Sequence, residues 1–219
     1  MLTALKKAIR YMEPDIDYNT RLYIPFNEGT GSVAKDYSQF GNHADLTDVL
    51  WGIGINGSAG IFNGSTSVGN CGNDASLNIT DAITAAAYVN SSANGSIVWR
   101  GTDGTNGMWG LDYDSGKLRI LYATENSFFA ADILSGVIPV TDGTRHYVVG
   151  TFDGSNMRLY VDGVPDGVKA KITKPTPKDT TTFIGAYRGT SLYFNGTMNN
   201  ILILAKAQPS EQIAADCYV

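Results

Sequence analysis

The sequence contains little cysteine, little histidine and no long apolar segment. Its two cysteines, Cys71 and Cys217, exclude a disulfide-rich scaffold, and neither they nor the two histidines, His43 and His146, have the spacing of zinc ligands. We expect two buried free thiols, although the sequence also allows one bridge between them. No apolar run approaches the roughly 20 residues of a membrane-spanning helix, so no membrane partner is expected.

Charged residues are also scarce, and basic residues are fewer than acidic ones. They make up 17% of the chain, with 16 Lys and Arg against 21 Asp and Glu. This net charge of −5 argues against a nucleic-acid partner. Lys6, Lys7 and Arg10 interrupt the apolar stretch that a secretion signal requires, so the sequence has no recognisable signal peptide.

The first residues have the pattern of a short amphipathic helix. Leu2, Leu5, Ile9 and Met12 recur at spacings of three and four, and Pro14 ends the pattern. A helix of this length is marginal alone. Residues 1–20 are therefore predicted to be an extension that docks either on its own domain or on a neighbouring subunit or partner.

Residues 21–219 are predicted to form one all-β domain. Short apolar or alternating runs are separated by Asp-Gly and Asn-Gly pairs, which accept the positive φ angles of hairpin turns. Many short strands bury their apolar faces when two sheets pack together. Strands are expected at residues 22–26, 60–62, 82–89, 96–99, 108–113, 118–123, 146–152, 157–161, 182–187 and 201–204, with a short helix at 209–216.

Several strings resemble laminin-G-like domains of the concanavalin A-like lectin/glucanase superfamily. The first are LYIPFNEGTG at residues 22–31 and DYSQFGNHADL at 36–46. The most specific is HYVVGTFDGSNMRLYVDGV at residues 146–164, which is similar to the central hairpin of these domains. GTMNNILILAKAQPSEQI at 196–213 resembles their closing strand and short helix. The resemblance implies a two-sheet antiparallel jelly-roll sandwich.

The same resemblance implies a structural Ca²⁺ ion near one edge of the sandwich. Asp36, Glu28 and Asn199 are the candidate metal ligands, since Ca²⁺ takes oxygen ligands. Asn199 and Asn200 stand where the closing strand usually has carboxylates, which counts against the site. Without a metal, Asp36 would cap a turn and Glu28 would be a solvated turn residue.

The sequence lacks the catalytic pattern that glycanases of this fold use. That pattern places two carboxylates at alternate positions of one strand, facing the substrate. Asp112 and Asp114 alternate on an expected strand, but Asp114 also begins an Asp-Ser-Gly turn. No catalytic residue is therefore assigned.

A binding surface is the remaining kind of site. Sugars are recognised by aromatic faces, Arg and planar amides. Aromatic residues on sandwich strands usually belong to the core, but Trp109 and Tyr187 are flanked by turns and are expected to be exposed. The candidate ligand-binding residues are Trp109, Tyr187, Arg188, Tyr122 and Arg100.

The sequence thus favours a non-catalytic recognition or adhesion domain that binds a glycan or a cell-surface polysaccharide. It would be extracellular or displayed on a surface, which includes a virion. One alternative is a structural virion decoration or fibre protein that assembles with itself or with a capsid partner through residues 1–20. The other is a polysaccharide hydrolase or lyase, for which Asp112 would be the first residue to test.

Overall fold

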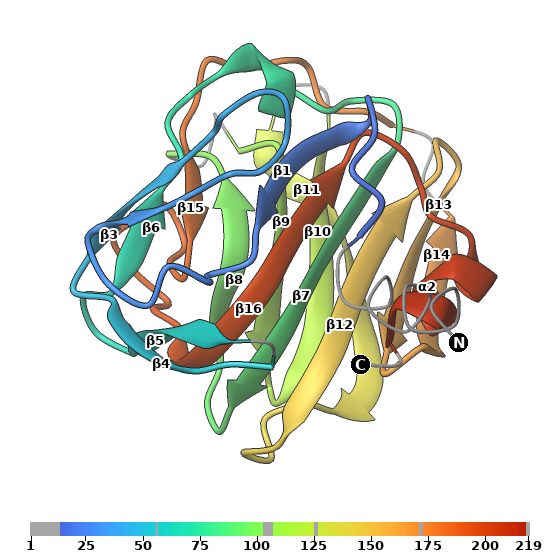
Figure 1. Ribbon diagram of the computed structural model, residues 1–219. Coiled ribbons are helices and arrows are strands. Elements are labelled where there is room, and N and C mark those ends of the chain that lie inside the picture. The colour runs from blue at the N-terminus through green and yellow to red at the C-terminus, as the bar shows by residue number, and fades with distance from the viewer. Residues whose placement is uncertain (1–13, 56, 103–106, 125–126, 171–172, 218–219) are drawn as a thin grey trace, which may run out of the picture.

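Two antiparallel β-sheets pack face to face in the computed structural model, which describes residues 14–55, 57–102, 107–124, 127–170 and 173–217 (Figure 1). The first sheet, here called sheet A, has eight strands: β1 (Thr20–Ile24), β4 (Leu50–Ile53), β5 (Ser58–Asn63), β7 (Ile83–Ser91), β12 (Arg145–Phe152), β13 (Asn156–Val161), β14 (Val164–Ala170) and β16 (Asn195–Leu204). Their order is β14-β13-β12-β7-β16-β5-β4, and β1 also pairs with β16.

Sheet B has the order β11-β10-β9-β8-β15-β6-β3-β2. Its strands are β2 (Val33–Ala34), β3 (Ala44–Thr47), β6 (Val68–Asn70), β8 (Gly95–Arg100), β9 (Trp109–Asp114), β10 (Lys117–Thr124), β11 (Ser127–Pro139) and β15 (Thr182–Ile184). A short 3-10 helix, η2 (Ala75–Leu77), precedes β7. The all-β jelly-roll sandwich expected from the sequence is confirmed.

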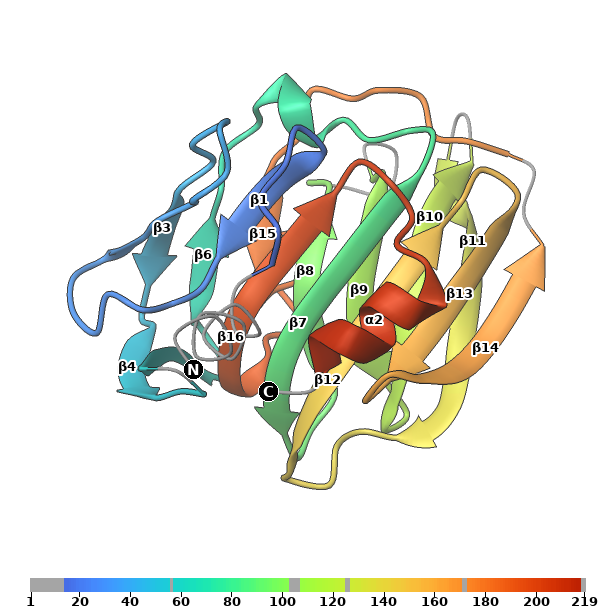
Figure 2. The same cartoon turned by 45° about the vertical axis from the view of Figure 1, so that its right-hand side comes forward.

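The core lies between the sheets because alternate residues of each strand point inward. The core includes Leu111 and Ile120 from sheet B, and Val148 and Ile203 from sheet A. The outer face of sheet A is also apolar, and the C-terminal helix α2 (Ser210–Cys217) covers it (Figure 2). No helix in the described part of the chain is long and apolar enough to span a membrane.

Every expected strand coincides with an observed one, and the expected C-terminal helix is α2. The strands that the sequence pattern did not predict are β2, β3, β4, β6, β11 and β14. Asp166-Gly167 was expected to mark a turn but lies inside β14, where Gly167 pairs with Leu159. The expected N-terminal helix falls on residues 1–13, which lie outside the described residues.

Both cysteines are free thiols. Cys71 is buried in the core as expected, and this burial raises the pKa of its thiol. Cys217 is only partly buried, at the end of α2, which corrects the expectation for that residue.

Candidate functional site

Two of the predicted binding aromatics lie in the core rather than on the surface. Trp109 is 1% exposed, and its indole Nε1 donates to the carbonyl oxygen of Leu77 at 3.3 Å. Tyr122 is fully buried, and its hydroxyl donates to the carbonyl oxygen of Ile79 at 3.0 Å. The expected exposure of Trp109 is therefore wrong, because its strand register turns Trp109 inward with Leu111.

Arg100 is buried as well, and its guanidinium is held by hydrogen bonds within the protein. Its guanidinium donates to Oγ1 of Thr182 at 2.7 Å and to Oδ1 of Asn78 at 2.7 Å, and it also reaches the carbonyl oxygen of Asp74. Because burial disfavours the charged form, the pKa of Arg100 is lowered to about 10. These contacts tie the η2 region to sheet B, and they leave Arg100 unable to meet a ligand at the surface.

Tyr187 and Arg188, in contrast, lie together at a tight turn. The amide of Thr190 donates to the carbonyl oxygen of Tyr187 at 3.2 Å, while Arg188 and Gly189 have φ angles of 57° and 71°. Two consecutive positive φ angles with this hydrogen bond define a type I′ turn. The turn places Arg188 at its tip, and both side chains are partly exposed.

This turn packs on the outer face of sheet B through Trp99. Trp99 is paired with Gly110 and Phe183 on the neighbouring strands, so its side chain points away from the core. A Cβ at Gly110 would lie 2.3 Å from the Trp99 ring, so the glycine leaves room for the indole. The Tyr187 ring contacts Trp99 with a centroid distance of 4.3 Å, and the guanidinium of Arg188 stacks 4.3 Å above the Tyr187 ring.

From the sequence, Trp99 is one of several aromatic residues on expected strands, and nothing distinguishes it from the others. Its outward direction depends on the irregular register between Ser96 and Val98, which places Ile97 and Val98 both in the core. No local sequence pattern marks such a bulge. The side chain on which the turn packs is therefore one that sequence reasoning does not single out.

A salt-bridge network occupies the next positions on the same face. Arg119 donates from Nε and Nη2 to the two carboxylate oxygens of Asp112, at 2.8 and 2.7 Å, and from Nη1 to Asp114 at 2.9 Å. Burial raises the pKa of Asp112, although the bonds from Arg119 oppose this shift. Asp112 and Asp114 do share one face, but they are bound by one guanidinium rather than facing each other across a cleft. Ser96 is opposite Asp112, and its buried Oγ has no hydrogen-bond partner among the described residues.

The three candidate calcium ligands are engaged in separate structural contacts. Both oxygens of Asp36 accept hydrogen bonds, from the amides of Tyr23, Ser38 and Asn42 and from the Ser38 hydroxyl, at 2.6 to 2.8 Å. Oε1 of Glu28 accepts from the amide of Lys35, and the Asn199 amide donates to the carbonyl oxygen of Ser58.

The described residues contain no group of three or more His, Cys, Asp or Glu side chains that could hold a metal ion. Asp36 serves as the turn cap that was the alternative interpretation, because its carboxylate accepts from the amides of Ser38 and Asn42. The calcium site on Asp36, Glu28 and Asn199 stays a prediction.

A family comparison agrees with the resemblance seen in the sequence. A laminin G family model, described as the concanavalin A-like lectin/glucanases superfamily, matches residues 63–214. The chain belongs to this superfamily. A comparison of this concanavalin A-like chain with curated proteins finds no match.

Several solved structures share this concanavalin A-like fold. Domain 4 of AbnA, an extracellular GH43 arabinanase from Geobacillus stearothermophilus solved with arabinotriose, has a TM-score of 0.71 and 14% identity over 91% of this chain and 98% of its own. The binding domain of Paraclostridial Mosquitocidal Protein 1 has a TM-score of 0.71 and 12% identity over 90% of this chain. The binding domain of Botulinum Neurotoxin DC in complex with SialylT has a TM-score of 0.66 and 11% identity over 90% of this chain.

These identities establish the fold alone. The chain spans 51% of the mosquitocidal binding domain and 50% of the neurotoxin binding domain.

Proposed function

We propose that this chain is a non-catalytic glycan-recognition domain, extracellular or surface-displayed, which contacts its sugar through the Tyr187–Arg188 turn on the outer face of sheet B. The observation that carries the proposal is that Arg188 stacks on the Tyr187 ring, which in turn packs edge-on against Trp99. An aromatic ring beside a guanidinium offers an apolar face for sugar C–H groups and donors for sugar hydroxyls.

The conformation of Arg188 supports a role for its side chain. Glycine, asparagine or aspartate is favoured at positive φ in a type I′ turn, so arginine at φ 57° is an unfavourable choice for the backbone. The Nε of Arg188 is buried without a hydrogen-bond partner among the described residues, and no carboxylate there forms an ion pair with it.

Two of the structural relatives were solved with glycan ligands, namely arabinotriose and SialylT. This supports a glycan as the ligand class for the present chain. The virion alternative depends mainly on residues 1–13, outside the described part of the chain, and remains a prediction. The hydrolase or lyase alternative lacks support from Asp112 and Asp114, since both carboxylates are bound by Arg119.

The test is a glycan array followed by calorimetry with the glycans that bind. Arg188→Asn removes the guanidinium but keeps a residue that accepts positive φ, so the turn and the circular dichroism spectrum should be retained. We expect affinity to fall at least tenfold. Arg145→Asn, at an exposed arginine on sheet A, is the matched control and should bind like the unmodified protein.

Absence of binding to every glycan on the array would count against the function itself. Equal affinity of the Arg188→Asn and Arg145→Asn proteins would instead show that the glycan does not bind at the Arg188 turn.

A further inference from the structure

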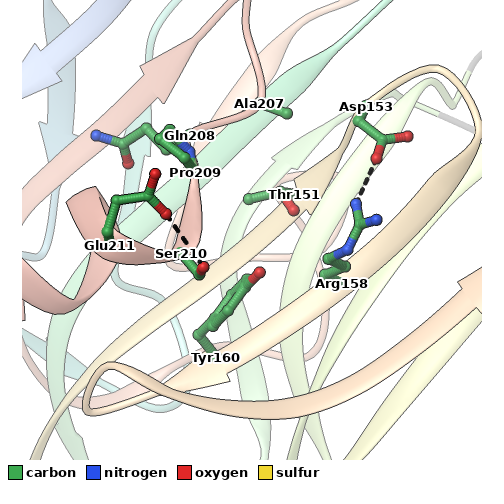
Figure 3. A pocket seen from close by; sticks show the side chains of 9 residues that line it. All are labelled: Thr151, Asp153, Arg158, Tyr160, Ala207, Gln208, Pro209, Ser210 and Glu211. Atoms are coloured by element: carbon green, nitrogen blue, oxygen red, sulfur yellow. Dashed lines mark hydrogen bonds and ion pairs between the residues drawn. The ribbon is translucent and has the colours of Figure 1, made fainter.

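A pocket of about 330 Å³ opens on the opposite sheet, near the N-terminal end of α2 (Figure 3). Thr151, Asp153, Arg158 and Tyr160 of the β12–β13 hairpin line one part of it, and residues 207–211 line the rest. This volume lies at the lower end of the roughly 300–1,000 Å³ found for small-molecule sites. The pocket has room for one small polar molecule.

Long-range pairing builds this pocket from two distant segments. Thr151 is paired with Arg158 and Val149 with Tyr160, so these side chains share the outer face of sheet A. The other segment is held by Thr84, whose buried Oγ1 donates to the carbonyl oxygen of Lys206 at 2.7 Å and accepts from the amide of Gln208 at 2.8 Å. The pocket is therefore fixed by buried contacts.

Two hydroxyl groups that line the pocket have no protein partner. Thr151 is 1% exposed and Tyr160 is 5% exposed, and neither side-chain hydroxyl takes part in a hydrogen bond among the described residues. Figure 3 shows both hydroxyls between the two sides of the pocket. Both hydroxyls are open to the pocket, so a ligand with hydroxyl groups of its own can donate hydrogen bonds to them and accept hydrogen bonds from them.

The charged groups of the pocket indicate which ligand it suits. The Asp153–Arg158 ion pair lies on one side, and Glu211, which accepts a 3.3 Å hydrogen bond from the Ser210 hydroxyl, lies on the other (Figure 3). Two carboxylates against one guanidinium leave an excess of negative charge and of acceptors. An acidic sugar would be repelled, whereas an uncharged sugar can donate its hydroxyl protons to the carboxylates.

We propose that this pocket is a second saccharide site, which takes one uncharged sugar unit. For the class of ligand the proposal rests on the proposed function, but the site is separate, because it lies on sheet A and the Arg188 turn lies on sheet B. The domain would then bind glycans on two opposite faces and could cross-link polysaccharide chains.

The test is a titration of ¹⁵N-labelled protein with arabinotriose and with uncharged and acidic disaccharides, followed by NMR. We expect amide shifts at residues 151–160 and 207–211 with uncharged sugars. Tyr160→Phe and Thr151→Val each remove one hydroxyl and should weaken binding at these residues at least fivefold. Tyr147→Phe is the matched control, because Tyr147 is also 5% exposed on the same face and does not line the pocket.

The outcomes separate the two proposals. Shifts confined to residues around Arg188 would overturn the second site and leave the proposed function intact. Shifts at the pocket that are unchanged in both hydroxyl variants, or that are larger with acidic sugars, would overturn the assigned recognition. No shift with any sugar, together with an empty glycan array, would overturn both proposals.

Discussion

Gly136 and Asp166 show how single residues close the sandwich at one edge. Asp166 on β14 is buried, and its Oδ1 accepts hydrogen bonds from the amides of Val137 and Ile138 on β11, both at 2.8 Å. These strands are the edge strands of the two different sheets. A Cβ at position 136 would lie 1.8 Å from Oδ2 of Asp166, so only glycine allows this contact.

Gly136→Ala should therefore destabilise the protein by about 1–3 kcal/mol, the usual cost of overpacking a buried site. Urea denaturation followed by fluorescence would measure it. The control is Gly167→Ala on β14, where the nearest atom to the added Cβ would be Cδ1 at the flexible end of Leu134, at 3.3 Å. Equal stability of the two variants would show that the Asp166 contact does not require glycine at 136.

Arg100 and Arg188 illustrate why residue type alone does not identify a binding residue. Both are arginines beside aromatic residues in the sequence, and both are predicted from it to bind ligand. Arg100 points inward and is satisfied by Thr182 and Asn78, whereas Arg188 stands at the tip of a turn. The difference lies in position: Arg100 is on the inward-facing side of β8, whereas Arg188 is on a turn outside any strand.

At the scale of elements, α2 joins the C-terminal segment to sheet A. Ile213 is fully buried against the aromatic outer face that contains Tyr88 and Tyr147. The Tyr88 hydroxyl donates to the carbonyl oxygen of Asp216 at 2.6 Å, and this bond anchors the last turn of the helix. The first turn of α2 also supplies Ser210 and Glu211 to the pocket.

Ile213→Ala should lower the free energy of unfolding by about 2–5 kcal/mol, because a large buried side chain is removed. Ile133→Ala, the same substitution at a side chain that is 41% exposed, should change it by less than about 0.5 kcal/mol. Thermal denaturation of both variants provides the measurement. A small effect at Ile213 would mean that α2 contributes little to the stability of sheet A.

Across the whole molecule, hydrogen bonds and ion pairs to exposed carboxylates determine the response to acid. The pKa values of Asp17, Asp74, Asp142 and Asp153 are lowered. For Asp142 the pKa falls to about 2, mainly because Thr144 donates from its hydroxyl and its amide. Burial raises the pKa of Asp112 and Asp216, so protonation of these two residues acts in the opposite sense.

A carboxylate with a lowered folded-state pKa stabilises the fold above its unfolded-state pKa, and this contribution is lost as the pH falls toward the folded-state value. For Asp142 the window is from about pH 4 to about pH 2. Asp142→Asn should therefore lose less stability across this window than the unmodified protein, as measured by urea midpoints at each pH. Asp48→Asn, at another exposed aspartate, is the control. A slope identical to that of the unmodified protein would contradict the role of Asp142.

The sequence by itself determined the fold class and most of the strands. Alternating apolar residues and the Asp-Gly and Asn-Gly turns are local signals, and Ser115-Gly116 and Asp162-Gly163 do adopt positive φ at strand reversals. β14 was missed because its sequence, VPDGVKA, carries Pro, Asp, Gly and Lys and so resembles a loop, as edge strands often do. The exposure of Tyr187 and Arg188 was also predicted from sequence, and both side chains are partly exposed because they lie at a turn.

Only the tertiary structure decided which face each side chain occupies. The alternation of apolar and polar residues indicates that neighbouring side chains point to opposite faces of a sheet. It does not indicate which face is the core, because that depends on pairing register and on bulges such as the one at Ser96. Because of this register, Trp109 and Tyr122 point into the core, whereas Trp99 points out of it. The pocket on sheet A joins residues 151–160 to residues 207–211, and their proximity results from hydrogen bonds across the sheet that no local pattern encodes.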